Sequence, residues 1–150
     1  DKAPNDITYN LAQIELDTDS NQLAEAEQRI NKMLTLYPGN YPLNQARVDL
    51  LLKQNRPADA EKALDGLLKS RPEDPDVWYL VAETRGLSGN IIGLHQARAE
   101  YFALVGDYRQ ALQHLAFAKK LTNNFQLSSR LDARQRELMD QERAVKDMMN

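Results

Sequence analysis

Residues 57–74 read PADAEKALDGLLKSRPED, and the spacing inside this stretch decides the fold. Ala60 is followed by a large aliphatic residue, Leu64, after four positions and by Pro72 after twelve. The same spacing occurs earlier in the chain, in the set Ala26, Ile30 and Pro38. The two sets are separated by a period of about 34 residues, which predicts stacked helical units, because one small unit cannot bury its apolar face without a neighbour.

A third set of residues keeps the spacing but shifts the period. Ala111 is followed by Leu115 after four positions and by Asn123 after twelve, so that Asn stands where Pro stood before. This set lies one period and a half after the second one. Gly89 and Gly106 are half a period apart and show the same half step. The sequence therefore predicts an extra half repeat before the third set.

The complete pattern is typical of the tetratricopeptide repeat (TPR), whose units are about 34 residues long. Trp78 and Ala82 match the first half of the repeat's signature. The Ala of each set lets two helix backbones approach closely, and Pro ends the unit because it cannot continue a helix. We therefore predict an all-α fold. Its class is a TPR-type α-solenoid of stacked antiparallel helix pairs with an extra half repeat and a polar C-terminal capping helix.

The repeats predict a single TPR domain over residues 1–150. Helices are expected over residues 6–17, 21–37, 42–54, 57–70, 75–88, 91–105, 108–121 and 125–148. The units are expected at about 6–40, 41–74 and 75–91, followed by a half-shifted unit at 92–124 and a C-terminal helix at 125–150. The helix over 91–105 would then belong to two units at once. Because Asp1 is preceded by neither an initiator Met nor an apolar signal segment, we also expect a processed protein or a piece of a longer one.

The last segment, 125–150, allows two interpretations. It is polar, with five basic and five acidic residues between Arg130 and Asp147. This composition suits a helix that caps a repeat array, because terminal units need a polar outer face. The alternative is a docking helix that would use four apolar residues: Leu127, Leu131, Leu138 and Met139.

Composition and charge exclude several classes of protein. The 150 residues include no Cys, which rules out a disulfide framework and a Cys-based zinc site. The net charge is −3, and neither half of the chain has the basic excess that nucleic acid demands. No apolar run approaches the roughly 18 residues that a membrane span needs. We therefore expect partners that are neither nucleic acid nor the membrane interior.

Catalytic patterns are also missing from the sequence. The only two histidines, His95 and His114, do not form the H-E-x-x-H pattern of a metalloprotease, because Gln96 and Leu115 follow them. No Walker loop, G-x-S-x-G elbow or Cys nucleophile occurs. We therefore predict no catalytic residue, no metal site and no cofactor in this chain, and we interpret both histidines as surface or packing residues.

The first helix of each TPR pair lines the concave groove in which such proteins bind partners. Counting from the aligned alanines predicts the groove residues. They are Tyr9, Gln45, Asp49, Leu52, Tyr79, Glu83, Gln96, Glu100 and Leu104. Successive steps carry the acids Asp49, Glu83 and Glu100, so we expect an acidic groove that repels the carboxylate terminus of a peptide. An extended protein segment that meets aromatic and aliphatic side chains is the expected ligand. Because Arg98 and Glu100 are two residues apart, we expect them to face different ways.

The second half of the chain resembles one TPR family in particular. The resemblance rests on several matched stretches: Trp78 with Ala82, Gly89, Gln96-Ala97-Arg98-Ala99-Glu100-Tyr101, Gly106, Gln110-Ala111 and Leu131-Asp132-Ala133-Arg134. They resemble the C-terminal TPR domain of the periplasmic M48-type zinc metalloproteases known as β-barrel assembly-enhancing proteases. The resemblance is best over about residues 41–136, and the first unit departs most from it.

This resemblance implies a function that composition and spacing do not. The parent protein would carry an N-terminal zinc protease domain, whose H-E-x-x-H helix is absent from these residues. It would assist the assembly of outer-membrane β-barrel proteins in the periplasm, or degrade those that stall. The TPR domain would dock the barrel assembly machinery, client barrels and its own protease domain. The alternative is a free-standing TPR scaffold of an envelope or secretion complex, with no protease attached.

Overall fold

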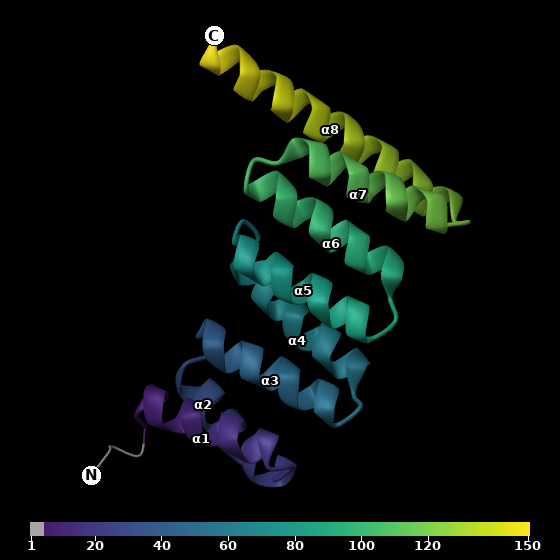
Figure 1. Ribbon diagram of the computed structural model, residues 1–150. Helices are drawn as coiled ribbons and strands as arrows, with labels where there is room; N and C mark the ends of the chain where they lie inside the picture. The colour runs from purple at the N-terminus through teal and green to yellow at the C-terminus, as the bar shows by residue number, and fades with distance from the viewer. Residues whose placement is uncertain (1–4) are drawn as a thin grey trace. The chain divides into compact units, whose positions relative to one another are not determined.

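The computed structural model describes residues 5–150, and all regular structure in this range is helical. Eight helices follow one another: α1 (Ile7–Asp19), α2 (Leu23–Leu36), α3 (Tyr41–Lys53), α4 (Pro57–Ser70), α5 (Pro75–Leu87), α6 (Ile91–Leu104), α7 (Tyr108–Leu121) and α8 (Phe125–Met149). Figure 1 labels them in order from purple to yellow. Their bounds lie within two residues of the predicted ones, and the predicted TPR-type α-solenoid class is confirmed. The first four residues of the predicted domain lie outside the described range.

Short polar side chains start most of these helices. The carboxylate of Asp6 accepts a hydrogen bond from the backbone N–H of Tyr9, and the side chain of Asn124 accepts one from Leu127. Asn40, Asn90 and Asp107 cap α3, α6 and α7 in the same way. Such caps satisfy backbone donors that the first turn of a helix leaves without a partner. The pattern of caps explains why the sequence breaks its helices where it does.

The half repeat is visible in the backbone of the turns. Within residues 5–150, four residues adopt a positive φ angle: Asn21, Asn55, Gly89 and Gly106. The first three follow one another at the full period, and the last follows Gly89 by half a period. At each of them the next residue donates its N–H to a carbonyl five residues earlier, which closes the end of the preceding helix. Because α6 ends with the turn that otherwise ends α1, α3 and α5, it begins as the second helix of one unit and ends as the first helix of the next.

The chain divides into two compact units, which meet in sequence at Pro72 and Glu73. In the unit that ends at Pro72, α3 packs against α1, α2 and α4. Its core is apolar and comes from three helices: Ile14, Ala26, Ile30, Met33, Leu34, Leu43, Ala46 and Leu50. A small residue and a large one, Ala26 and Ile30, lie side by side in this core, as the repeat pattern predicts.

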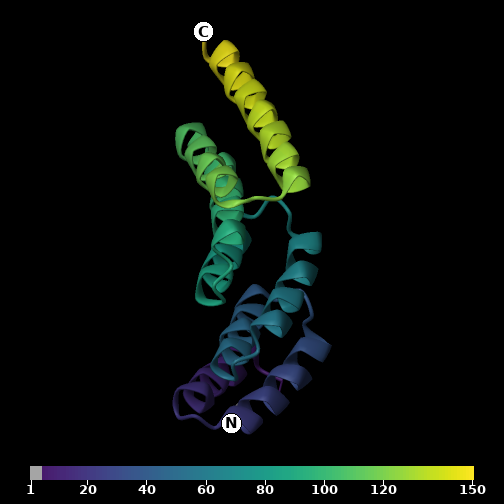
Figure 2. The same ribbon diagram turned by 90° about the vertical axis from the view of Figure 1, so that its right-hand side faces the viewer.

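In the second unit, from Glu73 to Asn150, each helix packs on the next along the chain. Helix α6 lies between α5 and α7, and α8 covers α7 (Figure 1). Leu131 and Leu138 of α8 are buried against Ala99, Ala111 and Leu115. They form part of the core, so the docking-helix alternative fails for these two residues and α8 is the capping helix. Figure 2 shows the C-terminal half of α8 continuing past α7.

Among residues 5–150, no helix combines the length and the apolar character that crossing a membrane requires. Helix α8 is the longest, with 25 residues, but charged side chains recur along its whole length.

Candidate protein-binding site

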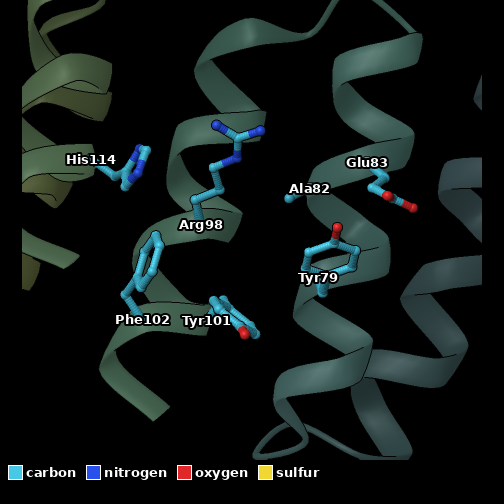
Figure 3. Close-up of a pocket in the computed structure, with 7 residues that line it drawn as sticks. All are labelled: Tyr79, Ala82, Glu83, Arg98, Tyr101, Phe102 and His114. Atoms are coloured by element: carbon cyan, nitrogen blue, oxygen red, sulfur yellow. The ribbon is translucent and has the colours of Figure 1, made fainter. Parts of the chain in front are cut away.

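A run of aromatic rings crosses three helices on one side of the second unit. Tyr79 of α5 meets Tyr101 of α6 edge-on, with ring centroids 5.8 Å apart. Tyr101 meets Phe102 at 5.3 Å, and Phe102 stacks on His114 of α7 at 5.4 Å. Figure 3 shows the two tyrosines projecting towards each other from α5 and α6. Edge-on and stacked contacts of this kind favour one ring arrangement, so the run forms a preformed surface.

These rings surround a cavity of about 280 Å³. Its lining comes from α5, α6 and α7: Tyr79, Ala82, Glu83, Arg98, Tyr101, Phe102 and His114 (Figure 3). We call it the aromatic pocket. A cavity of roughly 150 Å³ is enough to hold benzene, so this one has room for a large apolar side chain. Tyr79 is 52% exposed, which leaves the entrance open to solvent.

Two opposite charges stand at the aromatic pocket. Arg98 rises from the middle of α6, and Glu83 lies on α5 (Figure 3). Within residues 5–150 neither side chain takes part in an ion pair. Arg98 is therefore available to polar groups of a ligand that enters the pocket, whereas the exposed side chain of Glu83 points away from the rings in Figure 3.

One of the two histidines, His114, lines the aromatic pocket, and it contacts the other, His95 of α6. Their Nδ1 atoms are 3.0 Å apart, so one imidazole donates a hydrogen bond and the other accepts it. The rings stack with centroids 5.2 Å apart, and both contact Phe117. Burial, followed by the nearby charge of Arg98, lowers the pKa of His95; burial, followed by the charges of His95 and Arg98, lowers that of His114. The pair is therefore neutral at pH 7.

The histidine pair predicts a pH dependence of stability. The folded state lowers both pKa values below the ordinary value of about 6.5, so the unfolded chain binds more protons at acidic pH. The stability that the neutral pair contributes is complete above that value and is lost as the pH falls through the folded-state pKa values. We expect the free energy of unfolding, measured with denaturant, to fall less between about pH 7.5 and about pH 5 in His95→Gln than in the unchanged protein. Equal losses in the two proteins would contradict this assignment.

The opposite side of α6 has a different chemistry. The Arg134 side chain of α8 donates two hydrogen bonds to the carboxylate of Glu100, at 2.7 Å and 3.0 Å. It donates a third, at 2.8 Å, to Glu137 one turn later. The bond to Glu100 is the main cause that raises the pKa of Arg134 above its ordinary value. A second cavity, of about 540 Å³, opens beside this pair.

The predicted groove residues of the second unit divide between these two sides. Tyr79 and Glu83 line the aromatic pocket, whereas Gln96 and Glu100 line the second cavity. Leu104 lies at the end of α6 and is partly exposed. Arg98 and Glu100 face opposite ways, as the sequence predicts. The structure thus does not bring the five residues into one groove, and their role in binding stays a prediction.

The predicted groove residues of the first unit also lie apart from each other. Tyr9 of α1 lines a cavity of about 440 Å³ together with Arg29 and Lys32 of α2. Gln45 and Asp49 are exposed on α3, and Leu52 is half-buried there. This cavity is lined by α1 and α2 alone, so α3 contributes nothing to it.

The residues of the predicted TPR signature have structural positions. Ala26, Ala60, Ala82 and Ala111 are buried. Trp78 is half-buried, and Pro38 and Pro72 lie exposed in the loops that follow α2 and α4. Sequence reasoning missed His95, His114 and Phe102 as members of a site. The signal for His95 and Phe102 was their spacing of three and four positions from Arg98 along α6, which places them on one side of the helix. His114 lies on α7 and had no such signal.

No group of three or more His, Asp or Glu side chains in the described range is arranged to hold a metal ion. The aromatic pocket instead offers rings, one cation and one anion. This set of groups can bind a protein segment through apolar contact and hydrogen bonds.

Helix pairs that recur with a period of about 34 residues are typical of TPR-type α-solenoids, a fold class whose members bind other proteins. A sequence profile described as tetratricopeptide repeat matches residues 17–84. Over 100 residues the chain is 34% identical to a protein of Vibrio cholerae serotype O1 (strain ATCC 39315 / El Tor Inaba N16961) named "Putative beta-barrel assembly-enhancing protease". The alignment covers 66% of this chain and 20% of that protein, so the chain spans about a fifth of the relative's length.

Proposed function

We propose that this chain is the protein-docking domain of a periplasmic protease and chaperone that acts on outer-membrane β-barrel proteins. Three observations support the proposal. The fold is of a class that binds proteins, and the relative's name refers to barrel assembly. Two residues of the run that resembles the family, Arg98 and Tyr101, line the aromatic pocket. The proposed partners are the barrel assembly machinery, client barrels and the protease domain of the same protein.

The aromatic pocket is the observation that carries this proposal. Unfolded barrel strands alternate apolar and polar side chains, and aromatic residues are frequent at their ends. An apolar side chain of such a segment fits into the cavity beside the paired rings of Tyr79 and Tyr101, while a polar neighbour reaches Arg98. Tyr is favoured at protein interfaces because it offers a large rigid surface at low cost in conformational entropy. The pocket therefore suits an extended, largely unfolded client.

The proposal also assigns client binding and hydrolysis to separate domains of the parent protein. This chain would hold the client, and a separate M48-type domain would supply hydrolysis. The zinc ion of that domain would be held by its own H-E-x-x-H histidines, a pattern that the present sequence does not contain. Holding a client next to a protease raises its effective concentration at the active site, which favours degradation of a client that stays unfolded.

The first test measures binding of an unfolded outer-membrane β-barrel protein, diluted from denaturant, to the domain. Tyr101→Ala removes the ring that touches both Tyr79 and Phe102, so we expect the dissociation constant to rise about tenfold or more. Phe125→Ala is the matched control, because this ring is 84% exposed and lies outside the lining of the pocket. Circular dichroism should show the same helix content in both variants. Equal affinities in both variants would exclude the aromatic pocket as the client site.

A second test identifies the partner. A photoreactive residue at Tyr79 should crosslink to the barrel protein or to components of the assembly machinery, whereas one at the exposed Arg143 of α8 should not. Equal yields at the two positions would contradict the proposal. The sequence of the parent gene distinguishes the free-standing scaffold from the protease. An H-E-x-x-H helix encoded in that gene would exclude the scaffold, and a complete gene without such a helix would exclude the protease assignment.

A further inference from the structure

The second cavity has a charge that the sequence did not lead us to expect. It is lined by residues of α5 to α8: Trp78, Arg85, Gln96, Glu100, Leu115, Leu127, Arg130, Leu131 and Arg134. Three arginines and one glutamate therefore contribute to its lining. We call it the arginine pocket. The groove was expected to be acidic at this step because of Glu100, but Glu100 is engaged by Arg134 and its charge is compensated.

The ion pair inside the arginine pocket shows what kind of group the pocket accepts. Arg134 holds Glu100 through two of its nitrogens, Nε and Nη2, which bind the two carboxylate oxygens. A guanidinium fork and a carboxylate match in this way because both are planar. The pocket thus already contains one bound carboxylate, supplied by the chain itself.

Arg130 lies one turn before Arg134 on α8 and lines the same pocket. Its side chain is exposed and makes no ion pair or hydrogen bond within residues 5–150. Arg85, on the facing helix α5, donates to the backbone carbonyl of Gly93 at 3.2 Å. The lining also contains apolar side chains, among them Trp78 and Leu127. The pocket therefore pairs an unmatched cation with apolar surface.

We propose that the arginine pocket is a second binding site, which takes an acidic segment of a protein partner. A carboxylate of that segment pairs with Arg130 in the way that Glu100 pairs with Arg134, and an apolar side chain beside it rests on Trp78 and Leu127. The whole chain has a net charge of −3, so its overall charge repels an acidic ligand. Such a ligand can therefore bind only at a local positive site. The proposal shares with the proposed function only the premise that the ligand is a protein.

The two pockets lie on opposite sides of α6, because Arg98, Tyr101 and Phe102 are about half a helical turn away from Gln96 and Glu100. One ligand in each pocket can therefore be bound at the same time. Each side chain of a ligand can enter only one of the two pockets. Substitutions in one pocket therefore test binding there without affecting the other.

The experiment uses a fluorescein-labelled synthetic peptide of glutamates around a central leucine, together with its all-glutamine counterpart. The acidic peptide should bind, the glutamine peptide should bind about tenfold more weakly or not at all, and raising NaCl from roughly 0.05 M to 0.5 M should weaken binding. Trp78 is the only Trp of the chain, so its fluorescence should change when the acidic peptide binds. This readout locates the peptide independently of the label.

Charge-reversal variants of α8 supply the control. Arg130→Glu should weaken the acidic peptide about tenfold or more, and Arg130→Lys should retain part of the affinity. Arg143→Glu makes the same charge change on the same helix, but outside the pocket, and should have little effect. Tyr101→Ala should leave this binding unchanged. Equal losses in Arg130→Glu and Arg143→Glu, equal binding of the two peptides, or an unchanged Trp78 signal would each overturn the proposal, whatever the aromatic pocket binds.

Discussion

Replacing Leu115 by Ala is expected to lower the free energy of unfolding by about 2–5 kcal/mol. Leu115 is 2% exposed and lies among Ala99, Ala111, Leu131 and Leu138, where α6, α7 and α8 meet. Truncation removes apolar surface from this core and leaves a cavity that rigid helices fill only in part. The residue also lines the arginine pocket, so the same change enlarges the floor of that site.

Urea unfolding followed by circular dichroism measures the loss. Leu121→Ala on the same helix is the control, because Leu121 is 51% exposed and its truncation should cost much less. Hydrogen exchange should show the loss of protection in α6, α7 and α8, since stability in repeat arrays depends on nearest neighbours. A cost below about 1 kcal/mol for Leu115→Ala would mean that this junction is loosely packed.

Replacing Ala60 by Leu is expected to lower the free energy of unfolding by about 1–3 kcal/mol, by the opposite mechanism. Ala60 is fully buried on α4 at a position equivalent to Ala26 and Ala111, which are fully buried as well. The three extra carbon atoms must displace a neighbouring helix, because a close-packed core has no free space for them.

Ala58→Leu is the control for this overpacking. Ala58 lies on the same helix two residues earlier and is exposed, so the same substitution should change the midpoint of urea unfolding little. A midpoint for Ala60→Leu equal to that of the unchanged protein would show that Ala60 does not lie at a close helix crossing.

The half repeat explains why the second unit carries two pockets of different chemistry. An α6 that belongs to two pairs has neighbours on both sides, α5 and α7, and two faces beside them remain accessible. The residues at 98, 101 and 102 supply one face and those at 96 and 100 the other. In the first unit α3 packs against α1 as well as α2 and α4, whereas α6 packs chiefly against α5 and α7.

The fold could be predicted from the sequence because its signals are local and repeated. A spacing of four positions fixes which side chains share a helix face, and the repeat period fixes which helices are equivalent. Pro, Gly and capping Asp or Asn residues mark the helix ends, so the bounds agree within two residues. The half repeat could be predicted for the same reason, from Gly89 and Gly106. The sequence did not indicate that Asn21 and Asn55 form equivalent turns.

The candidate sites depended on contacts that no local pattern contains. The sequence shows two histidines on separate helices, and only the packing of α6 on α7 brings their Nδ1 atoms to 3.0 Å. The sequence suggests that Glu100 is an acid of the groove. Only the packing of α8 brings Arg134, 34 residues later in the chain, into contact with Glu100. The net charge of a pocket is the sum of charges from helices that are distant in sequence. Repetition and helix periodicity by themselves determined the architecture of this protein, while tertiary packing alone decided which charges are paired, which rings touch and which side chains are left for a partner.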